Sequence, residues 1–145
     1  METVFSGNPW TTSFTEDSFG NIWIGTYRNG TFCFHKNQTP FQKSMSGKNI
    51  ECMSTDHSGN YWIGSLNGEV CVLDSTQKQI MGKTIFPNDM IHTIYGQESS
   101  NKVWVGTMYG LYEAWIESNK QIVYQKTSGI NIPSIRSIVQ DSCFL

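Results

Sequence analysis

The sequence predicts an all-β fold: a partial β-propeller of three complete four-stranded antiparallel blades, with a stub at each end. A Trp-x-Gly motif occurs three times, as IWIGT, YWIGS and VWVGT. The tryptophans are Trp23, Trp62 and Trp104, which are 39 and 42 residues apart. Such spacing is typical of propeller blades, which repeat about every 40 to 50 residues. No segment shows a helical period with caps.

Each repeat divides into four strand segments. In the first copy, residues 10–17 alternate and are rich in β-branched residues, which favours a strand. The tryptophan motif is the second strand, residues 31–36 are the third, and the more polar residues 41–45 suit an outer edge. The corresponding segments of the later copies are 50–56 and 90–96, 69–74 and 111–117, and 79–86 and 120–126.

Turn residues separate the first two strands of each copy. Asp17 and Asp56 can accept hydrogen bonds from backbone amides ahead of them, while Gly20 and Gly59 tolerate positive φ. Asp141 takes the same position at the start of a fourth copy, and the third copy has a longer turn, GQESSNK. One carboxylate per turn falls short of the roughly six to eight oxygens that calcium takes. We therefore expect these aspartates to hold turns.

The repeat also sets the expected blade boundaries. A tail of a preceding outer strand comes first and a truncated fourth blade comes last, and the predicted segments are 1–7 (tail), 8–46 (blade 1), 47–87 (blade 2), 88–131 (blade 3) and 132–145 (first strand of blade 4). The six-residue step from aspartate to tryptophan would place the next tryptophan beyond Leu145. Because propellers close with about four to eight blades, we expect a segment of a larger ring.

Charge and hydropathy exclude two classes of partner. A net charge of −2 and scattered Lys and Arg give no basic field for nucleic acid. No apolar run approaches the ~20 residues that cross a bilayer, and the opening METVFSGNPW does not resemble a signal peptide. We therefore expect neither nucleic-acid binding nor a membrane span in this chain.

The cysteines are expected to be free, mostly buried thiols. Cys33 and Cys71 each lie three residues after a repeat glycine, so they occupy equivalent positions in successive repeats. Facing sheets pack about 10 Å apart, beyond the ~7 Å limit between the Cα atoms of a disulfide. The alternative is an unforeseen pair that involves Cys52 or Cys143.

The complete pattern, EDSxGNxWIGTxxxG followed by a short strand, resembles the two-component regulator propeller repeat. The matching positions are 16–26 and Gly30, 56–65 and Gly68, and 104–107 with 110–111. The resemblance implies the extracytoplasmic sensor region of a hybrid histidine kinase, chiefly a Bacteroidetes protein. It further implies a periplasmic location, glycan-related signals and the remainder of a sensor propeller as a partner. Copies of the chain are the alternative partner.

Most repeated residues are expected to be structural. Tryptophans that recur at one position of each blade favour packing between sheets over stacking on a sugar. The glycine two residues after each tryptophan belongs to the same scaffold. These glycines are Gly25, Gly64 and Gly106.

Candidate binding residues lie in the loops between the second and third strands. The sequences of these loops differ among the copies, while the motif residues that flank them recur. The loops read TYRNG, SLNG and TMYG. Variable loops on a rigid scaffold are a common place for recognition. Tyr27, Arg28 and Tyr109 are the candidates, offering two aromatic rings and a guanidinium group to an oligosaccharide. The alternative is that they are plain exposed loop residues. Trp10 and Trp115 are further exposed-aromatic candidates.

No motif predicts catalysis, a metal or a cofactor. His35, His57 and His92 fall at different positions of the repeat, and each is expected to be a surface or satisfied histidine. The chain has no phosphoacceptor-histidine helix or ATP-binding domain, so we expect no kinase activity. A protein-interaction scaffold and a non-functional gene fragment are the alternatives to a sensor segment. A propeller lyase is the least favoured, because no convergent acid and base are found.

Overall fold

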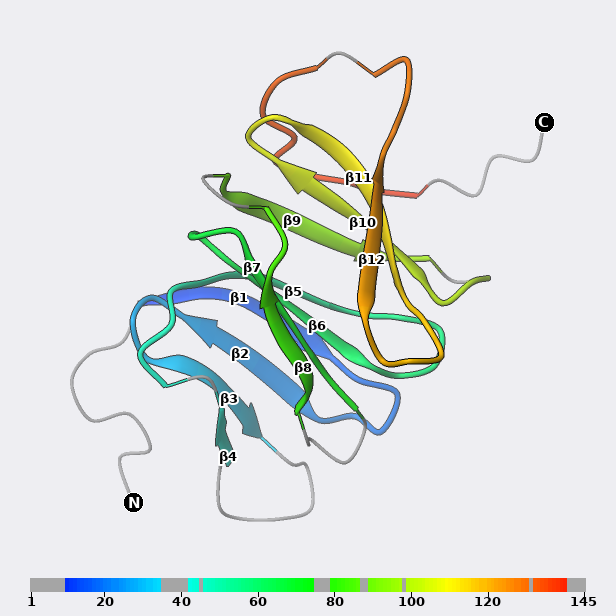
Figure 1. Ribbon diagram of the computed structural model, residues 1–145. Coiled ribbons are helices and arrows are strands. Elements are labelled where there is room, and N and C mark those ends of the chain that lie inside the picture. The colour runs from blue at the N-terminus through cyan, green and yellow to red at the C-terminus, as the bar shows by residue number, and fades with distance from the viewer. Residues whose placement is uncertain are drawn as a thin grey trace, which may run out of the picture.

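The computed structural model describes residues 10–34, 42–44, 46–74, 79–86, 89–97, 99–130 and 132–140. These residues form twelve strands and no helix. The strands make three four-stranded antiparallel sheets, each in the order of the chain, which we call blades 1, 2 and 3 (Figure 1). The predicted propeller-type fold is confirmed. None of the described segments forms a helix that could cross a membrane.

The four strands of each blade follow the four predicted segments. Blade 1 consists of β1 (Thr11–Glu16), β2 (Ile22–Thr26), β3 (Gly30–Phe34) and β4 (Gln42–Ser44). Blade 2 consists of β5 (Ile50–Thr55), β6 (Tyr61–Ser65), β7 (Glu69–Leu73) and β8 (Gln79–Thr84). Blade 3 consists of β9 (Ile91–Gly96), β10 (Lys102–Thr107), β11 (Gly110–Ile116) and β12 (Ile122–Lys126).

The first strands form the inner edge of the stack. β5 lies between β1 and β9 and contacts both, and the second strands β2 and β6 contact the first strand of the following blade. Figure 1 shows the three sheets stacked in chain order, from blade 1 at the bottom to blade 3 at the top. The fourth strand of each sheet lies at the opposite, outer edge.

The core fills the two spaces between blades. Trp23 of blade 1 packs at 4.1 Å between ring centroids against Tyr61 of blade 2, in a cluster with Ile50 and Ile63. Trp62 is fully buried in the second cluster, which joins blades 2 and 3. Burying aromatic and β-branched side chains between sheets is the main force that holds the stack together.

The glycine of the tryptophan motif is required by the neighbouring blade. A Cβ atom at Gly64 would lie 2.6 Å from Cγ2 of Ile91, the first residue of β9, and 2.9 Å from Sγ of Cys52. No side chain fits at that distance, so the position admits only glycine without displacement of the neighbour. The same contact recurs between Gly25 and Ile50, at 2.8 Å, and between Gly106 and Ile135, at 2.7 Å.

The first turns are held by aspartates that also orient the tryptophans. Asp17 accepts hydrogen bonds from the amides of Phe19 and Asn21, at 2.8 and 2.9 Å, and from the indole Nε1 of Trp23 at 3.2 Å. In blade 2, Asp56 binds the indole Nε1 of Trp62 in the same way at 2.9 Å. The carboxylate of each aspartate therefore joins the turn after the first strand to the buried tryptophan of the core.

Blade 3 departs from this pattern. Trp104 is half-buried, and no described sheet covers its outer side. Trp23 and Trp62 are buried between blades, whereas packing of Trp104 between two sheets stays a prediction. Gln97 stands where the other turns have aspartate, since its amide donates to the carbonyl of Lys102, as Asp17 does to Asn21. Asp141, the predicted fourth turn residue, lies outside the described residues.

Residues 132–140 run along blade 3 without forming a strand. The amides of Ser134 and Ile135 donate to the carbonyls of Met108 and Thr107, at 2.8 and 2.9 Å. A strand needs a partner ladder, and the described chain holds no further second strand for this segment to pair with. Its packing on Gly106 is nevertheless that of a first strand in the next repeat.

The described cysteines are free and buried, as expected. Burial raises the pKa of the Cys33 thiol to about 12, with Asp17 adding to the effect. Burial, followed by the charge of Glu69, raises the pKa of Cys71 to about 11. Cys143 lies outside the described residues. The described thiols are therefore core residues and poor nucleophiles at neutral pH.

Candidate functional site

One candidate surface lies at the hairpin between β2 and β3. The ring of Tyr27 stacks on that of Trp10 with centroids 6.1 Å apart, and Cζ of Arg28 lies 5.0 Å from the Tyr27 centroid. Trp10 is 72% exposed. We call Trp10, Tyr27 and Arg28 the blade 1 patch. Two aromatic faces beside a guanidinium group can stack on a ring and donate hydrogen bonds to oxygen atoms.

Local backbone contacts hold the blade 1 patch. The amide of Tyr27 donates to the carbonyl of Trp10 at 2.9 Å, which fixes the segment before β1 against the hairpin. Thr26 donates from Oγ1 to the carbonyl of Gly30 at 2.7 Å and closes the turn. Arg28 has a φ of 71°, a left-handed conformation that is uncommon for a side-chain-bearing residue. Such positions are often found at binding sites.

Tyr109 is not part of this surface. It belongs to the hairpin between β10 and β11 and is 60% exposed, with its amide donating to Oγ1 of Thr107 at 3.1 Å. In the described part of the chain, no side-chain contact joins it to the blade 1 patch. Trp115 is half-buried, and Nζ of Lys102 lies 5.2 Å from its ring. Of the predicted candidates, the structure brings Tyr27, Arg28 and Trp10 together.

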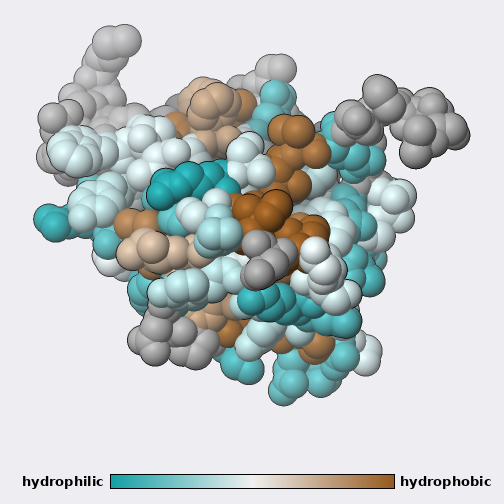
Figure 2. Space-filling view, turned by 90° about the horizontal axis from the view of Figure 1, so that it is seen from above, coloured by the Kyte–Doolittle hydropathy of each residue, from teal (hydrophilic) through white to brown (hydrophobic). Residues whose placement is uncertain are grey.

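A cavity lies at the open side of blade 3. It has a volume of about 510 Å³, and its lining residues are Tyr95, Gln97, Ser99, Trp104, Ile138, Val139 and Gln140. Val139 is 84% exposed. Figure 2 looks at the molecule from above blade 3 and shows apolar side chains gathered near the centre, with hydrophilic ones around them. This side of the stack is the place that a following blade would occupy.

A smaller cleft, of about 200 Å³, lies between the first turns of blades 1 and 2. Asp17 and Asp56 both line it. Burial raises the pKa of Asp17, but hydrogen bonds outweigh that effect and lower the pKa to about 2. The donors are the Tyr61 hydroxyl, at 2.5 Å, with Asn21 and Trp23. Because these donors occupy both oxygens, the carboxylate is engaged in structure. No cluster of metal-ligating side chains occurs among the described residues.

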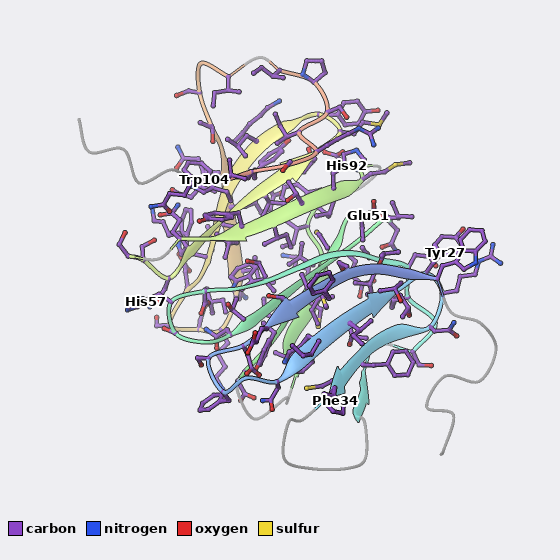
Figure 3. All side chains as sticks on the ribbon, turned by 180° about the vertical axis from the view of Figure 1, so that it is seen from behind. Tyr27, Phe34, Glu51, His57, His92 and Trp104 are labelled. Carbon is purple, nitrogen blue, oxygen red and sulfur yellow. The ribbon has the colours of Figure 1, made fainter. Side chains whose placement is uncertain are left out.

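The histidines lie apart, and one departs from expectation. His57 is exposed in the first turn of blade 2, while His92 lies on β9 at the other end of the sheets (Figure 3). Nε2 of His92 is buried and has no hydrogen-bond partner. The expectation of a surface or satisfied histidine is therefore wrong for His92, which lies at an irregularity of the β9–β10 ladder where no described polar group reaches its Nε2. His35 lies outside the described residues.

Residues 5–28 match the family model of the two component regulator propeller. The chain carries a two component regulator propeller repeat. The matched segment holds the blade 1 patch and the aspartate-capped turn of blade 1, together with Trp23 and Gly25. The repeat is thus matched where the turn, the buried indole and the motif glycine occur together. No curated protein sequence matches the chain.

Solved structures share the fold. The extracellular domain assigned to the hybrid two component system BT3049 of B. thetaiotaomicron superposes with a TM-score of 0.72 at 22% identity, covering 93% of this chain and 20% of that one. The extracellular domain assigned to the one component system BT4673 gives 0.67 at 20% identity, covering 92% and 18%. The chain therefore spans about a fifth of the length of these structures.

An enzyme also shares the architecture. Virginiamycin B lyase from Staphylococcus aureus superposes with a TM-score of 0.65 at 13% identity, covering 83% of this chain and 42% of that chain. At these identities the likenesses establish the blade architecture alone. Function has to be argued from the side chains of this chain.

Proposed function

We propose that the chain is a segment of the extracytoplasmic, periplasmic sensing propeller of a hybrid two-component signalling system. In this proposal it binds a polysaccharide-derived signal and has no kinase activity of its own. The observation that carries the proposal is the two component regulator propeller repeat at residues 5–28, on a fold shared with extracellular domains of such systems.

The blade 1 patch is the proposed contact for the oligosaccharide. Trp10 offers an exposed aromatic ring stacked beside Tyr27, and the guanidinium group of Arg28 lies over the ring of Tyr27. Sugars present apolar C–H faces together with hydroxyl oxygens, so they match an aromatic plane beside a guanidinium group. We include Tyr109 as a separate contact on blade 3, because its exposed ring lies in the equivalent hairpin.

The test is a glycan array with the purified chain, followed by titration of each binding oligosaccharide. We expect Trp10→Ala and Arg28→Ala each to weaken binding at least about tenfold, because each substitution removes one complete side-chain contact with the sugar. Phe19→Ala is the matched control, since Phe19 is an exposed aromatic residue in the first turn of blade 1. Binding that is absent, or equally weakened by Phe19→Ala, would refute the proposed role of the patch.

The second candidate function is a protein-interaction scaffold. The observation that favours it is the cavity of about 510 Å³ beside Trp104, on a side of blade 3 that no described sheet covers. A protein partner captured through this side would be lost with Trp104→Ala and kept with Trp10→Ala. Glycan binding that is lost with Trp10→Ala and kept with Trp104→Ala would favour the sensor function.

A further inference from the structure

Residues 132–140 take the place of a first strand over blade 3. Ile135 lies against the glycine position of Gly106, as Ile91 of β9 lies against Gly64. The amide of Ile135 donates to the carbonyl of Thr107 at 2.9 Å, which fixes the start of the segment on blade 3. Figure 1 shows the segment in red, running along that blade.

The second half of this segment has an unpaired backbone. Residues 136–140 make no backbone hydrogen bond to any residue that the structure describes. In contrast, β1, β5 and β9 each pair along their length with the second strand of their own blade. A row of unpaired amides and carbonyls is a template for another strand. We call residues 136–140 the acceptor edge.

The repeat predicts which residues an added strand would place beside the acceptor edge. Counted from Ile135 and Ile91, positions 138 and 140 correspond to positions 94 and 96 of β9. Those two positions of β9 lie opposite Val105 and Val103, which are fully buried between blades 2 and 3. A strand added in the same antiparallel register therefore directs one side chain opposite Ile138 and one opposite Gln140 toward blade 3.

A cavity of about 510 Å³ lies where these two side chains would enter. Ile138 and Gln140 line it from the acceptor edge, and Tyr95, Gln97 and Trp104 line it from blade 3. The acceptor edge and the cavity thus share residues, so a strand that pairs with the edge can fill the cavity.

The corresponding space between blades 1 and 2 shows what kind of side chain fits. Tyr61, the first residue of β6, fills that space: its ring lies 4.1 Å from that of Trp23, and its hydroxyl donates to Asp17. Two residues later, Ile63 is fully buried in the same cluster. A Tyr-x-Ile pattern on one strand therefore fills the space beside the tryptophan of the preceding blade.

The open face of blade 3 retains the features that receive such a tyrosine. Trp104 is half-buried, and its indole Nε1 has no hydrogen-bond partner among the described residues. Gln97 and Ser99 add polar groups to the cavity, on the side where Asp17 meets the hydroxyl of Tyr61. The nearest charged group on the same face is Glu113, opposite Trp104 in the ladder, and it is paired with Lys102 at 2.7 Å. A side chain without charge therefore suits this cavity.

We propose that the acceptor edge and the cavity beside Trp104 bind an extended segment of a partner protein, added as an antiparallel strand. The segment carries a Tyr-x-Ile pattern, with the tyrosine opposite Gln140 and the isoleucine opposite Ile138. Main-chain hydrogen bonds supply affinity in this mode of recognition, and the alternate side chains supply specificity. The proposal rests on the second candidate function, the interaction scaffold, and names the partner that it would take.

The experiment uses a synthetic hairpin with the sequence of residues 59–74, which contains Tyr-Trp-Ile, with Cys71→Ser to prevent oxidation. Fluorescence anisotropy measures binding of the labelled hairpin to the full chain. Hydrogen exchange with mass spectrometry then compares the amides of the acceptor edge with and without the hairpin. A second hairpin with Tyr61→Ala removes only the ring that would enter the cavity.

Two variants of the chain test the site from the other side. Trp104→Ala removes the stacking partner, and Ile138→Ser removes an apolar contact of the cavity. Ile132→Ser is the matched control, since Ile132 belongs to the same segment, is 59% exposed and does not line the cavity. Circular dichroism of each variant verifies that the strands are retained.

We expect the hairpin to bind and to slow exchange of the acceptor-edge amides at least about tenfold, because strand pairing gives these amides hydrogen-bond partners. Tyr61→Ala in the hairpin, and Trp104→Ala or Ile138→Ser in the chain, are each expected to weaken binding at least about tenfold. Ile132→Ser is expected to leave binding unchanged.

The proposal is overturned if the hairpin does not bind, if Tyr61→Ala binds equally well, if binding leaves the acceptor-edge amides unprotected, or if Ile132→Ser weakens binding as much as Ile138→Ser. A chain that is dimeric by sedimentation and already protected at the acceptor edge also overturns it, since a second copy would then be the occupant. Capture of a protein partner that depends on Trp104 while the hairpin fails would keep the interaction scaffold and remove strand addition alone. Glycan binding at the blade 1 patch is tested separately by Trp10→Ala.

Discussion

Replacing Gly64 by alanine tests whether the motif glycine holds neighbouring blades together. The new Cβ would lie 2.6 Å from Cγ2 of Ile91, 2.9 Å from Sγ of Cys52 and 3.1 Å from Cδ1 of Ile94. Favourable contacts between carbon atoms lie near 3.5 to 4.0 Å, so the methyl group overlaps its surroundings by roughly 1 Å. Ile91 is fully buried and has no space to retreat into. Overpacking of this kind costs about 1 to 3 kcal/mol.

The destabilisation caused by Gly64→Ala can be separated from the intrinsic preference of a strand for alanine over glycine. Alanine is favoured over glycine within a strand by roughly 0.5 to 1 kcal/mol, so propensity alone predicts stabilisation. We expect instead a net destabilisation of about 2 kcal/mol. In urea unfolding followed by tryptophan fluorescence, this corresponds to a midpoint lower by about 1 M at a slope typical of small proteins.

A double-mutant cycle with Ile91→Ala identifies the contact responsible. Ile91→Ala alone is expected to cost about 2 to 5 kcal/mol, because it empties a buried site. In that background the methyl group of Gly64→Ala no longer meets Cγ2, so its cost is expected to fall by at least about 1 kcal/mol. Equal costs in the two backgrounds, or a Gly64→Ala protein as stable as the parent, would refute the inter-blade contact as the reason for the glycine.

Three further outcomes follow from the core and the turns. Because hydrogen bonds in the fold lower the pKa of Asp17 from 3.8 to about 2, its stabilising contribution is present above about pH 4 and lost as the pH falls toward 2. Asp17→Asn is expected to flatten this dependence in urea unfolding between pH 2 and 5. In a Cys143→Ser background, the buried thiols, including Cys33, are expected to react with Ellman's reagent at pH 8 only after urea unfolds the chain. Acrylamide is expected to quench Trp104 more strongly than Trp62, measured in variants that retain one tryptophan.

The sequence predicts the blades well because their signals are local. The tryptophan motif, the aspartate turn and the variable hairpin all lie within about 20 residues of one another, and each reports on one sheet. The pairing of Asp17 with Trp23 joins two such signals through one hydrogen bond. In-phase repetition then makes the assignment of one copy evidence for the others.

Contacts between blades could not be predicted from the sequence in the same way. The reason for Gly64 is Ile91, which lies 27 residues away in sequence and in another sheet. The partial exposure of Trp104 depends on what covers blade 3, and no residue near Trp104 in the sequence reports it. The aromatic partner of Tyr27 is Trp10, which precedes the strand by one residue and reaches the hairpin only through the fold.

A weak signal for the bulge positions was present. The ladder between the first and second strands skips one residue in each blade, Thr12, Glu51 and His92, which is a β-bulge. An isoleucine precedes this residue at 50–51 and 91–92, and the same pair type recurs at 135–136, whereas blade 1 has Thr11 before Thr12. Simple alternation hides this pair, because the bulge inserts one residue and shifts the faces of the strand. Only the register of the ladder shows that Glu51 and His92 lie outside it.

The repeat separates two kinds of position by how their chemistry varies. The motif glycine is the same in every copy because a neighbouring isoleucine fills the same space each time, so its identity is fixed by packing. The bulge position has the same backbone geometry in each blade, yet its residue changes from Thr12 to Glu51 to His92. Packing therefore does not choose these side chains. An unpaired carboxylate and an imidazole nitrogen without a partner gain nothing from packing, so the residue at this position can change while the blade keeps its geometry.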